Sequence, residues 1–539
     1  MNVIPKPAKV DPSPGSFRLT EETEVLFQAD SPEAKPVAEF LAEKLAGLFG
    51  ARRLPRALAP VNDAEDSIVL AIAGAAVEPG DEGYDLLIEP SRVLLRARNA
   101  AGLFYGAQTL CQLLHARIEG NQTNHLSPDL GPTAIELSAF RSHTHTPTLG
   151  AESKSMSRNA THAGPGGFSL PCGHITDQPR FKWRGLLIDC SRTFQTTACL
   201  KRYIDLLAFH KMNVLHLHLT DDQGWRMEIQ SHPELTLFGS QFEEKYHDSG
   251  GYYTQNDLRE LLAYATERHV LLVPEIEMPG HCLAALKAHP ELSCTGGPFE
   301  IYPFFKGPPI QENVFCAGND RVFDLLEEVL AEVIAIFPSP FIHIGGDEVP
   351  KVNWQKCPKC QARLKAEGLK NEDELQSYFI RRMAKFLASR NRRLIGWDEI
   401  MDGGLAEGAA VMSWRGMEAG IEAIRRGHDV VFSPTSHCYF DYGYSHISLE
   451  KTYSFEPMLE GLSPEQTPHI LGVQANMWTH LARSDDALDE QVFPRLVALA
   501  EVGWSPRSGR DWRDFSERME THYERLDRLG VKYKRMDQG

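Results

Sequence analysis

The spacing of hydrophobic positions becomes regular after residue 179. Short apolar runs recur there, and amphipathic patterns fill most of the intervals between them. Apolar runs of about four to eight residues predict strands buried on both faces, whereas apolar positions three or four residues apart predict helices. The predicted strands are residues 185–189, 214–219, 270–276, 341–344, 394–397, 410–414, 430–433 and 470–473.

The intervals between these strands predict helices at 200–209, 254–268, 321–337 and 371–389. Two of these helices begin with a capping signal, because Thr254 stands three residues before Asp257 and Asn371 stands three residues before Glu374. Strands that alternate with helices in this way predict an α/β fold, a (β/α)8 TIM barrel over residues 179–507.

The remaining segments are less regular. Residues 1–118 predict a small α/β (α+β) accessory domain with a strand at 67–72, a hairpin of 84–88 and 93–97, and helices at 32–48 and 100–114. Residues 119–178 are rich in Ser, Thr, His, Gly and Pro and predict a mobile linker or insert. Residues 508–539 predict a C-terminal helix, 510–529, packed on the barrel.

The composition is that of an ordinary soluble protein, with 42% hydrophobic and 24% charged residues in 539. A net charge of −17 argues against nucleic acid or an anionic membrane as a partner. The first thirty residues contain no apolar signal core, and no stretch approaches a membrane span. The sequence as given predicts a cytoplasmic protein, or a periplasmic or secreted one if a leader has been removed.

The cysteine pattern gives little sign of a metal. Among ten cysteines, Cys357 and Cys360 form the only close pair, and neither a second such pair nor a histidine pair stands at zinc spacing. Free thiols or one local disulfide are therefore favoured over a structural metal. We expect neither a cofactor nor a catalytic metal.

Polar and aromatic residues gather where the predicted strands end. Active sites of such barrels lie at the carboxyl ends of the strands. Carboxylates and arginine there suit sugar hydroxyls, and tryptophans suit a flat sugar face or an enclosed methyl group. The strand ends carry Asp189 and Arg192, Asp221 and Asp222, Glu275, Glu277 and His281, Asp347 and Glu348, Trp397, Asp398 and Glu399, Trp414 and Arg415, Tyr439 and Asp441, and Trp478 and His480.

Four of these strand ends resemble motifs of the family-20 glycoside hydrolases, the β-N-acetylhexosaminidases. The motifs are RGLLIDCSR (184–192), HLTDDQGWR (218–226), PEIEMPGH (274–281) and HIGGDEV (343–349), and they occur in the family's order. The segment GLFYG (102–106) also resembles the accessory domain that precedes the barrel in this family. The resemblance covers the whole barrel.

The resemblance implies a retaining exo-β-N-acetylhexosaminidase that removes terminal non-reducing N-acetylglucosamine or N-acetylgalactosamine from β-glycosides. In this family the substrate's acetamido oxygen attacks the anomeric carbon and forms an oxazolinium intermediate. Glu348 would be the general acid, with a pKa raised by burial and by Asp347. Asp347 would hold the acetamido N–H, and Tyr439 would hydrogen-bond the acetamido oxygen.

The resemblance also implies substrate-binding roles. Trp397, Trp414 and Trp478 would enclose the acetamido methyl and the sugar face. Arg192 and Asp441 would bind sugar hydroxyls, while Asp221 and His281 would support the catalytic groups. The other acids at the strand ends are interpreted as structural partners. Three positions depart from the family pattern, in which His, Asp and Glu are common: they are Thr193, Glu277 and His480. His480 would still bind sugar hydroxyls, since a histidine donates or accepts hydrogen bonds, with a different pH profile or sugar preference.

Two other classes stay open at this point. Clustered acids at strand ends also suit a metal-dependent barrel enzyme, although the tryptophans fit that reading poorly. A non-catalytic N-acetylhexosamine-binding relative is the other alternative. An oligosaccharide is the expected partner. The preferred sugar, the linkage, homo-oligomer formation and the role of 119–178 are not decided by the sequence.

Overall fold

The computed structural model describes residues 2–49, 54–58, 65–74, 77–115, 167–246, 250–307, 311–458 and 461–536. The chain forms two compact units. One contains residues 9–177 and 520–530 together with the first two residues, and the other contains 3–8, 178–519 and 531–539.

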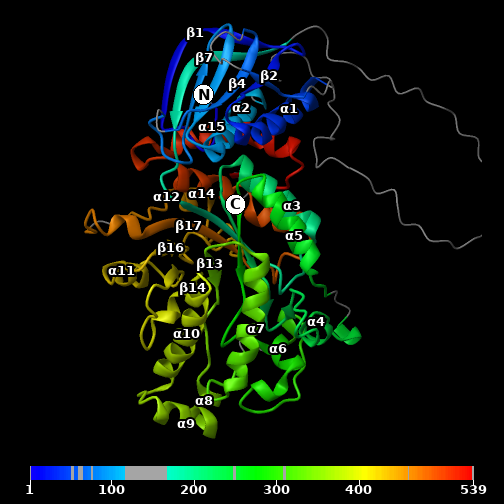
Figure 1. Ribbon diagram of the computed structural model, residues 1–539, viewed down its shortest axis with the longest axis vertical. Helices are drawn as coiled ribbons and strands as arrows, with labels where there is room; N and C mark the ends of the chain where they lie inside the picture. Colours follow the sequence, from blue (N-terminus) through cyan, green and yellow to red (C-terminus); the bar gives the residue numbers. More distant parts are fainter. Residues whose placement is uncertain are drawn as a thin grey trace, which may run out of the picture. The chain divides into compact units, whose positions relative to one another are not determined.

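The second unit contains a closed barrel of parallel strands, which confirms the predicted fold (Figure 1). The strands follow one another around the barrel in the order β12-β13-β14-β15-β16-β17-β8-β9. Because all pairs are parallel, the carboxyl ends of the strands meet at one rim. The bounds are β8 (Trp183–Asp189), β9 (Val214–His218), β12 (Leu271–Glu275), β13 (Phe341–His343), β14 (Arg393–Trp397), β15 (Ala410–Ser413), β16 (Val430–Phe432) and β17 (Ile470–Met477).

Apolar side chains from most of these strands fill the barrel. Trp183, Leu187, Val273 and Ile395 belong to one buried cluster, and Trp397 closes it toward the rim. Strands buried on both faces are usually rich in apolar residues, which is why most of them were visible as apolar runs.

Helices flank the barrel strands (Figure 1). The longer ones are α3 (Thr197–Phe209), α5 (Gln255–Thr266), α7 (Asp320–Ile336), α10 (Glu372–Ser389), α11 (Glu418–Arg425) and α14 (Arg495–Trp504). The shorter elements are β10 (Thr220–Asp221), β11 (Gly224–Trp225), α4 (Glu234–Gly239), α6 (Leu283–Ala288), α8 (Val352–Lys356), α9 (Pro358–Ala366), α12 (Leu449–Ser454) and α13 (Asp485–Val492).

The two predicted capping signals have different outcomes. Thr254 and Asp257 form a reciprocal capping box at the start of α5. At α10 the Asn371 side chain accepts from the Glu374 N–H as expected. The Glu374 carboxylate, however, accepts from the Lys370 N–H, so the second half of that predicted box is displaced by one residue.

The first unit contains a seven-stranded mixed sheet in the order β1-β7-β5-β6-β4-β2-β3. Helices α1 (Lys35–Phe49) and α2 (Ala100–His115) pack against each other and against the sheet (Figure 1). The predicted hairpin is confirmed as the antiparallel pair β5–β6. The strands are β1 (Lys9–Leu19), β2 (Glu24–Gln28), β3 (Arg56–Leu58), β4 (Ser67–Ile72), β5 (Tyr84–Ile88), β6 (Arg92–Ala97) and β7 (Phe168–Asp177).

Two predicted boundaries differ from the structure. Strand β7 falls inside the predicted linker 119–178, yet it pairs with β1 on one side and β5 on the other. The rest of that linker, up to residue 166, lies outside the described residues. Helix α15 (Trp512–Arg528) begins in the barrel unit, but its residues from Glu520 onward belong to the sheet unit, so the predicted C-terminal helix is divided between the two units. No helix among the described residues is both long and apolar enough to cross a membrane.

Candidate active site

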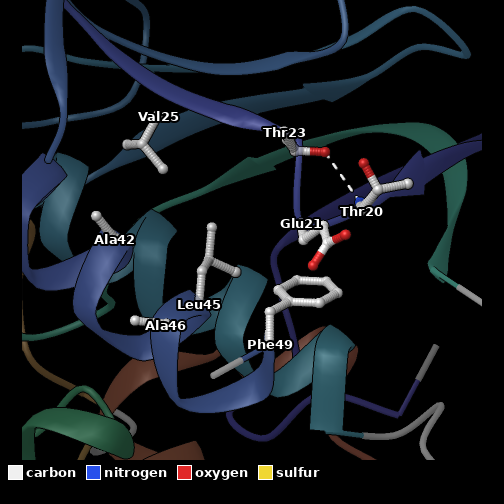
Figure 2. Close-up of a pocket in the computed structure, with 8 residues that line it drawn as sticks. All are labelled: Thr20, Glu21, Thr23, Val25, Ala42, Leu45, Ala46 and Phe49. Atoms are coloured by element: carbon white, nitrogen blue, oxygen red, sulfur yellow. Dashed lines mark hydrogen bonds between the residues drawn. The ribbon is translucent and has the colours of Figure 1, made fainter. Parts of the chain in front are cut away.

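A small hollow in the first unit lies between α1 and the segment leading into β2, as Figure 2 shows. Thr20 donates its N–H to the Thr23 hydroxyl at its edge. Its other lining residues are Glu21, Val25, Ala42, Leu45, Ala46 and Phe49, so Glu21 is the one ionisable group. This lining offers little chemistry, in contrast to the rim of the barrel.

The residues predicted for the site all follow barrel strands at the same end. Arg192 follows β8, Asp221 follows β9, and His281 follows β12. Asp347 and Glu348 come after β13. The remaining ones are Trp397 at the end of β14, Trp414 after β15, Tyr439 and Asp441 after β16, and Trp478 and His480 after β17.

A tight turn presents Asp347 and Glu348. Gly345 and Gly346 have φ of 65° and 94°, and Glu348 itself has φ of 46°. A Cβ atom at Gly345 would overlap the carboxylate of Glu277, so the turn needs glycine for conformation and for space. A non-glycine residue such as Glu348 in this backbone region is uncommon and typical of functional sites.

The two acids of this pair have opposite electrostatic environments. Burial, with Glu275 and Glu348 nearby, raises the pKa of Asp347 to about 6. For Glu348 a hydrogen bond from His281 lowers the pKa below its usual value. The Glu348 side chain is 37% exposed. The sequence-based expectation of a raised Glu348 pKa is therefore wrong for this arrangement, because the effect of His281 outweighs that of burial.

His281 connects two groups of acids. Its Nδ1 lies 3.4 Å from Asp221 and 3.4 Å from Asp222, and its Nε2 lies 3.5 Å from Glu348 and 3.7 Å from Asp347. Burial alone would lower the pKa of His281, but Asp221 and the other acids raise it well above the usual value. The side chain is thus held as a cation between the turn and β10.

Arg192 is held rigidly at the rim. Its guanidinium donates to Asp221 at 2.6 Å and to the Gln223 side chain at 3.0 Å, and it lies 4.9 Å from the ring centre of Trp478. Burial would raise the pKa of Asp221, but Arg192 and His281 lower it. Arg192 and Asp221 therefore form a nearly buried ion pair.

Aromatic rings line the other side of the rim. Trp414 stacks on Tyr439 with ring centres 5.9 Å apart, and Trp478 lies 5.9 Å from Trp397 and 6.4 Å from Tyr439. The structure thus brings the predicted aromatic residues together. Trp397 is almost completely buried, and its indole N–H donates to Glu275 at 2.9 Å, so most of its surface belongs to the barrel core.

Asp441 and His480 lie in different surroundings. Burial raises the pKa of Asp441 to about 7, and its Oδ1 has no hydrogen-bond partner among the described residues. The ring of His480 lies 4.8 Å from Phe304, and burial lowers its pKa. Thr193, at another departure from the family pattern, donates its hydroxyl to the Thr479 carbonyl and so joins the loops after β8 and β17.

Sequence reasoning gave no role to the histidines inside the barrel. His218, His343 and His216 surround the Glu275 carboxylate at 2.5, 2.8 and 3.1 Å. Burial would lower the pKa of His218, yet Glu275 and Asp221 raise it to about 9. The alternation of His216 and His218 on one strand was the available signal, because alternate residues point to the same face.

Two further acids lie under the turn. Both carboxylate oxygens of Glu277 are buried without a hydrogen-bond partner among the described residues, and burial together with Asp347 raises its pKa well above the usual value. Burial and Asp347 also raise the pKa of Glu399 to about 8, and Trp414 donates its indole N–H to Glu399 at 2.8 Å. The neighbours of Asp347 thus include two carboxyl groups, Glu277 and Glu399, whose neutral forms are favoured.

Family models match almost the entire chain. The model described as "Glycosyl hydrolase family 20, catalytic domain" matches residues 181–507, and "Glycosyl hydrolase family 20, domain 2" matches residues 1–178.

Individual relatives agree with these models. A β-hexosaminidase of Porphyromonas gingivalis is 36% identical, and the match covers 99% of this chain but 64% of that protein. A β-N-acetylhexosaminidase of Cellulomonas fimi is 30% identical over 98% of this chain and 95% of its own length.

Solved structures of the same kind share the fold. A β-N-acetylhexosaminidase from Streptomyces coelicolor A3(2) is 31% identical, with a TM-score of 0.80 over 99% of this chain and 97% of its own. An exo β-N-acetylglucosaminidase from Vibrio harveyi, solved with N-acetylglucosamine, is 29% identical, with a TM-score of 0.81 over 99% of this chain and 78% of its own.

Proposed function

Since the chain belongs to glycosyl hydrolase family 20, we propose that it is a retaining exo-β-N-acetylhexosaminidase that uses its substrate's acetamido group as the nucleophile. The observation that carries the proposal is Asp347, which is buried at the rim with Oδ1 lacking a hydrogen-bond partner among the described residues. Such an oxygen requires a hydrogen-bond donor, and the amide N–H of an N-acetyl sugar supplies one.

Asp347 and Tyr439 are the groups that orient the acetamido group. With Asp347 ionised, its carboxylate accepts the amide N–H and stabilises the positive charge that develops when the acetamido oxygen attacks the anomeric carbon. The Tyr439 hydroxyl donates to that oxygen, and burial keeps this phenol protonated by raising its pKa well above the usual value. Holding a nucleophile within the substrate removes much of the entropic barrier, with effective molarities of about 10⁵ M or more.

Glu348 protonates the leaving oxygen. Its lowered pKa means that binding must change its surroundings before it carries a proton. A sugar over the exposed part of this carboxyl excludes water, which disfavours the charged form and raises the pKa. After the first step the same carboxylate accepts a proton from the water that opens the oxazolinium ion, which restores the starting state and gives net retention.

Arg192, Asp441 and the tryptophans hold the sugar. Arg192 is already aligned by Asp221 and Gln223, so little conformational entropy is lost when it donates to hydroxyls. Asp441 offers an acceptor oxygen without a partner among the described residues. Trp414 and Trp478 offer indole faces to the apolar side of the ring and to the acetamido methyl.

The test is hydrolysis of two β-N-acetylglucosaminides that differ in leaving group. Glu348→Gln should lower kcat by about 10²- to 10⁴-fold for an alkyl or sugar leaving group, because general acid catalysis supplies that much. A nitrophenyl leaving group needs little protonation and should lose far less. Glu407→Gln, at an exposed glutamate, is the matched control and should keep normal turnover.

Asp347→Asn completes the test, because it should slow both substrates equally. A thiazoline analogue of the intermediate should inhibit the parent protein at concentrations well below the substrate's KM. Normal turnover by Glu348→Gln with the alkyl leaving group, or insensitivity to the thiazoline, would contradict the proposal. Rates on the N-acetylglucosaminide and the N-acetylgalactosaminide compared side by side would show which sugar is preferred.

A further inference from the structure

Four cysteines from distant parts of the sequence meet in the barrel unit. The sulfurs of Cys294 and Cys360 lie 3.6 Å apart, those of Cys316 and Cys360 lie 3.6 Å apart, and those of Cys316 and Cys357 lie 3.7 Å apart. All four sulfurs are within 4.8 Å of one another. Cys316, Cys357 and Cys360 are buried and Cys294 is partly buried. We call this group the four-cysteine cluster.

The spacing is that of ligands around one ion. Zinc binds thiolate sulfur at about 2.3 Å in a tetrahedral site, which places neighbouring sulfurs about 3.8 Å apart. Disulfide sulfurs lie about 2.05 Å apart, and none of the ten cysteines is in a disulfide here. Buried thiols also pack as small apolar groups, but such packing requires neither four sulfurs nor their mutual contact.

The surrounding backbone is shaped for this contact. Cys357 is the N-cap of α9, and Cys360 lies in its first turn, where the helix dipole favours negative charge. The backbone N–H of Gly318 is directed at the sulfurs of Cys316 and Cys360. A Cβ atom at Gly318 would overlap the backbone of Lys359 and Cys360, so only glycine lets the two segments approach so closely.

We propose that the four-cysteine cluster is a structural zinc site that fastens together three loops of the barrel unit. Zinc forms four Zn–S bonds, each thiol releases its proton to solvent, and no oxidation takes place. All four positions are filled by protein sulfur, so no position remains for water or substrate. A tetrathiolate site of this kind supports structure and does not carry out catalysis.

The fastened loops include those that carry the proposed catalytic groups. Cys294 follows α6, which begins just after His281, and Cys357 and Cys360 follow the loop that begins at Glu348. Between them, Phe315 donates its N–H to the Pro279 carbonyl at 3.0 Å. Trp354 donates its indole N–H to the Phe315 carbonyl at 2.9 Å. The zinc ion would therefore fix the position of the loop that contains His281 relative to the loop that begins at Glu348.

This site was not recognisable from the spacing of cysteines. Cys357 and Cys360 have the spacing of a zinc half-site, but α7, β13 and α8 separate both Cys294 and Cys316 from them in the sequence. The fold alone brings the two halves together. The inference does not depend on the proposed activity, because its primary measurement is metal content.

The first experiment uses the full chain purified under reducing conditions without chelator. Elemental analysis should find about one zinc ion per chain. Replacement by Co²⁺ should give the strong visible absorption of a tetrahedral tetrathiolate, and removal of the metal should lower the temperature of thermal unfolding. Substoichiometric zinc with no cobalt spectrum would overturn the proposal, as would iron in the site or disulfides among these four cysteines in non-reducing peptide maps.

Single variants assign the metal to these cysteines. Cys316→Ser and Cys360→Ser should each lose most of the bound zinc and the cobalt spectrum. Cys172→Ser, at a buried free thiol in the other unit, is the matched control and should retain both. Zinc retained at the parent level by both cluster variants would overturn the assignment. If these variants fail to fold, the cobalt spectrum of the parent protein still decides.

Discussion

At the scale of single residues, the acids at the rim differ in their surroundings and therefore in their pKa values. Burial raises the pKa of Asp347, Asp441 and Glu399 to about 6, 7 and 8. Glu348 differs because it is half-exposed and bonded to the His281 cation, which lowers its pKa. Acid and base roles at one site arise from such differences between neighbouring carboxyl groups.

The raised pKa of Asp347 predicts a stability that depends on pH. In the folded chain the Asp347 carboxyl group keeps its proton up to about pH 6, whereas in the unfolded chain it loses that proton near pH 3.8. Stability contributed by Asp347 is therefore lost as pH rises between these values. Asp347→Asn removes the charge and should stabilise the protein at pH 7 by on the order of 3 kcal/mol, but hardly at pH 4.

Urea unfolding of the parent protein and Asp347→Asn at both pH values measures this difference. Asp441→Asn should behave similarly, with its transition shifted upward because its pKa is raised to about 7. A stabilisation of the same size at pH 4 and pH 7 would show that the ionised carboxylate is not the cause.

The motifs predicted which residues stand at the rim but not how they are charged. Sequence adjacency shows that Asp347 precedes Glu348, which led to the expectation of a raised pKa. It does not show that His281, 67 positions earlier in the chain, reaches the same carboxyl group. Likewise, Glu275 was visible at a strand end, whereas its three histidine partners come from two other strands.

At the scale of elements, the turn after β13 sets the position of Asp347 and Glu348, the proposed catalytic pair. Both glycines of this turn occupy the left-handed region, and Glu277 fills the space beside the first of them. The Glu277 carboxylate occupies the space that a side chain at position 345 would need. Glutamate fits at position 277, where aspartate is common in the family, because residue 345 is glycine.

Gly345→Ala should abolish most activity and destabilise the protein. It adds the cost of a left-handed alanine, about 1–2 kcal/mol, to a clash that displaces Glu277. Gly368→Ala is the matched control, since Gly368 has nearly the same φ, 66° against 65°, with nothing within 4 Å of its Cβ position.

Activity and the urea unfolding midpoint, measured for both variants, distinguish the cost of a left-handed alanine from the cost of the clash with Glu277. Gly368→Ala should lose some stability and keep its activity. Equal losses of stability in both variants, with activity retained by Gly345→Ala, would show that contact with Glu277 does not constrain the turn.

Elements with strong local patterns were predictable and others were not. Most barrel strands contain an apolar run, although β9 and β17 also carry buried polar residues, and the helices between the strands have clear amphipathic spacing. Strand β7 was missed because Pro171, Gly173 and His174 interrupt its pattern, and its pairing with β1 and β5 is what makes it a strand. The cap of α10 was only half predicted, because spacing alone does not decide which backbone N–H a carboxylate accepts.

At the scale of the whole molecule, the barrel unit uses residues from both ends of the chain. Arg518 on α15 donates to both oxygens of Glu501 on α14 at 2.8 and 2.7 Å and to the Val3 carbonyl at 3.0 Å. The N–H of Lys6 also donates to Glu501 at 2.9 Å. This buried ion pair joins α14, α15 and residues 3–8, which sequence analysis had assigned to the accessory domain.

Arg518→Met should therefore be strongly destabilising, because it leaves the buried Glu501 carboxylate without its ion-pair partner. Breaking a buried pair in this way costs about 3–5 kcal/mol. Arg513→Met is the matched control five residues earlier on α15, since Arg513 is 89% exposed and its partner Glu517 is 68% exposed. Thermal unfolding measures the stability of both variants. Equal midpoints would show that the buried Arg518–Glu501 pair contributes no more stability than the exposed Arg513–Glu517 pair.

Each unit is built from separate segments of the sequence, which limits how the barrel can be expressed alone or fused to another protein. A fragment cut where the family models divide the chain, at residues 181–507, would keep every group proposed to touch sugar. It would also strip Glu501 of Arg518 and of the Lys6 backbone. Fusion or domain-swap designs built on this barrel must therefore also include residues 3–8 and the segment that carries Arg518.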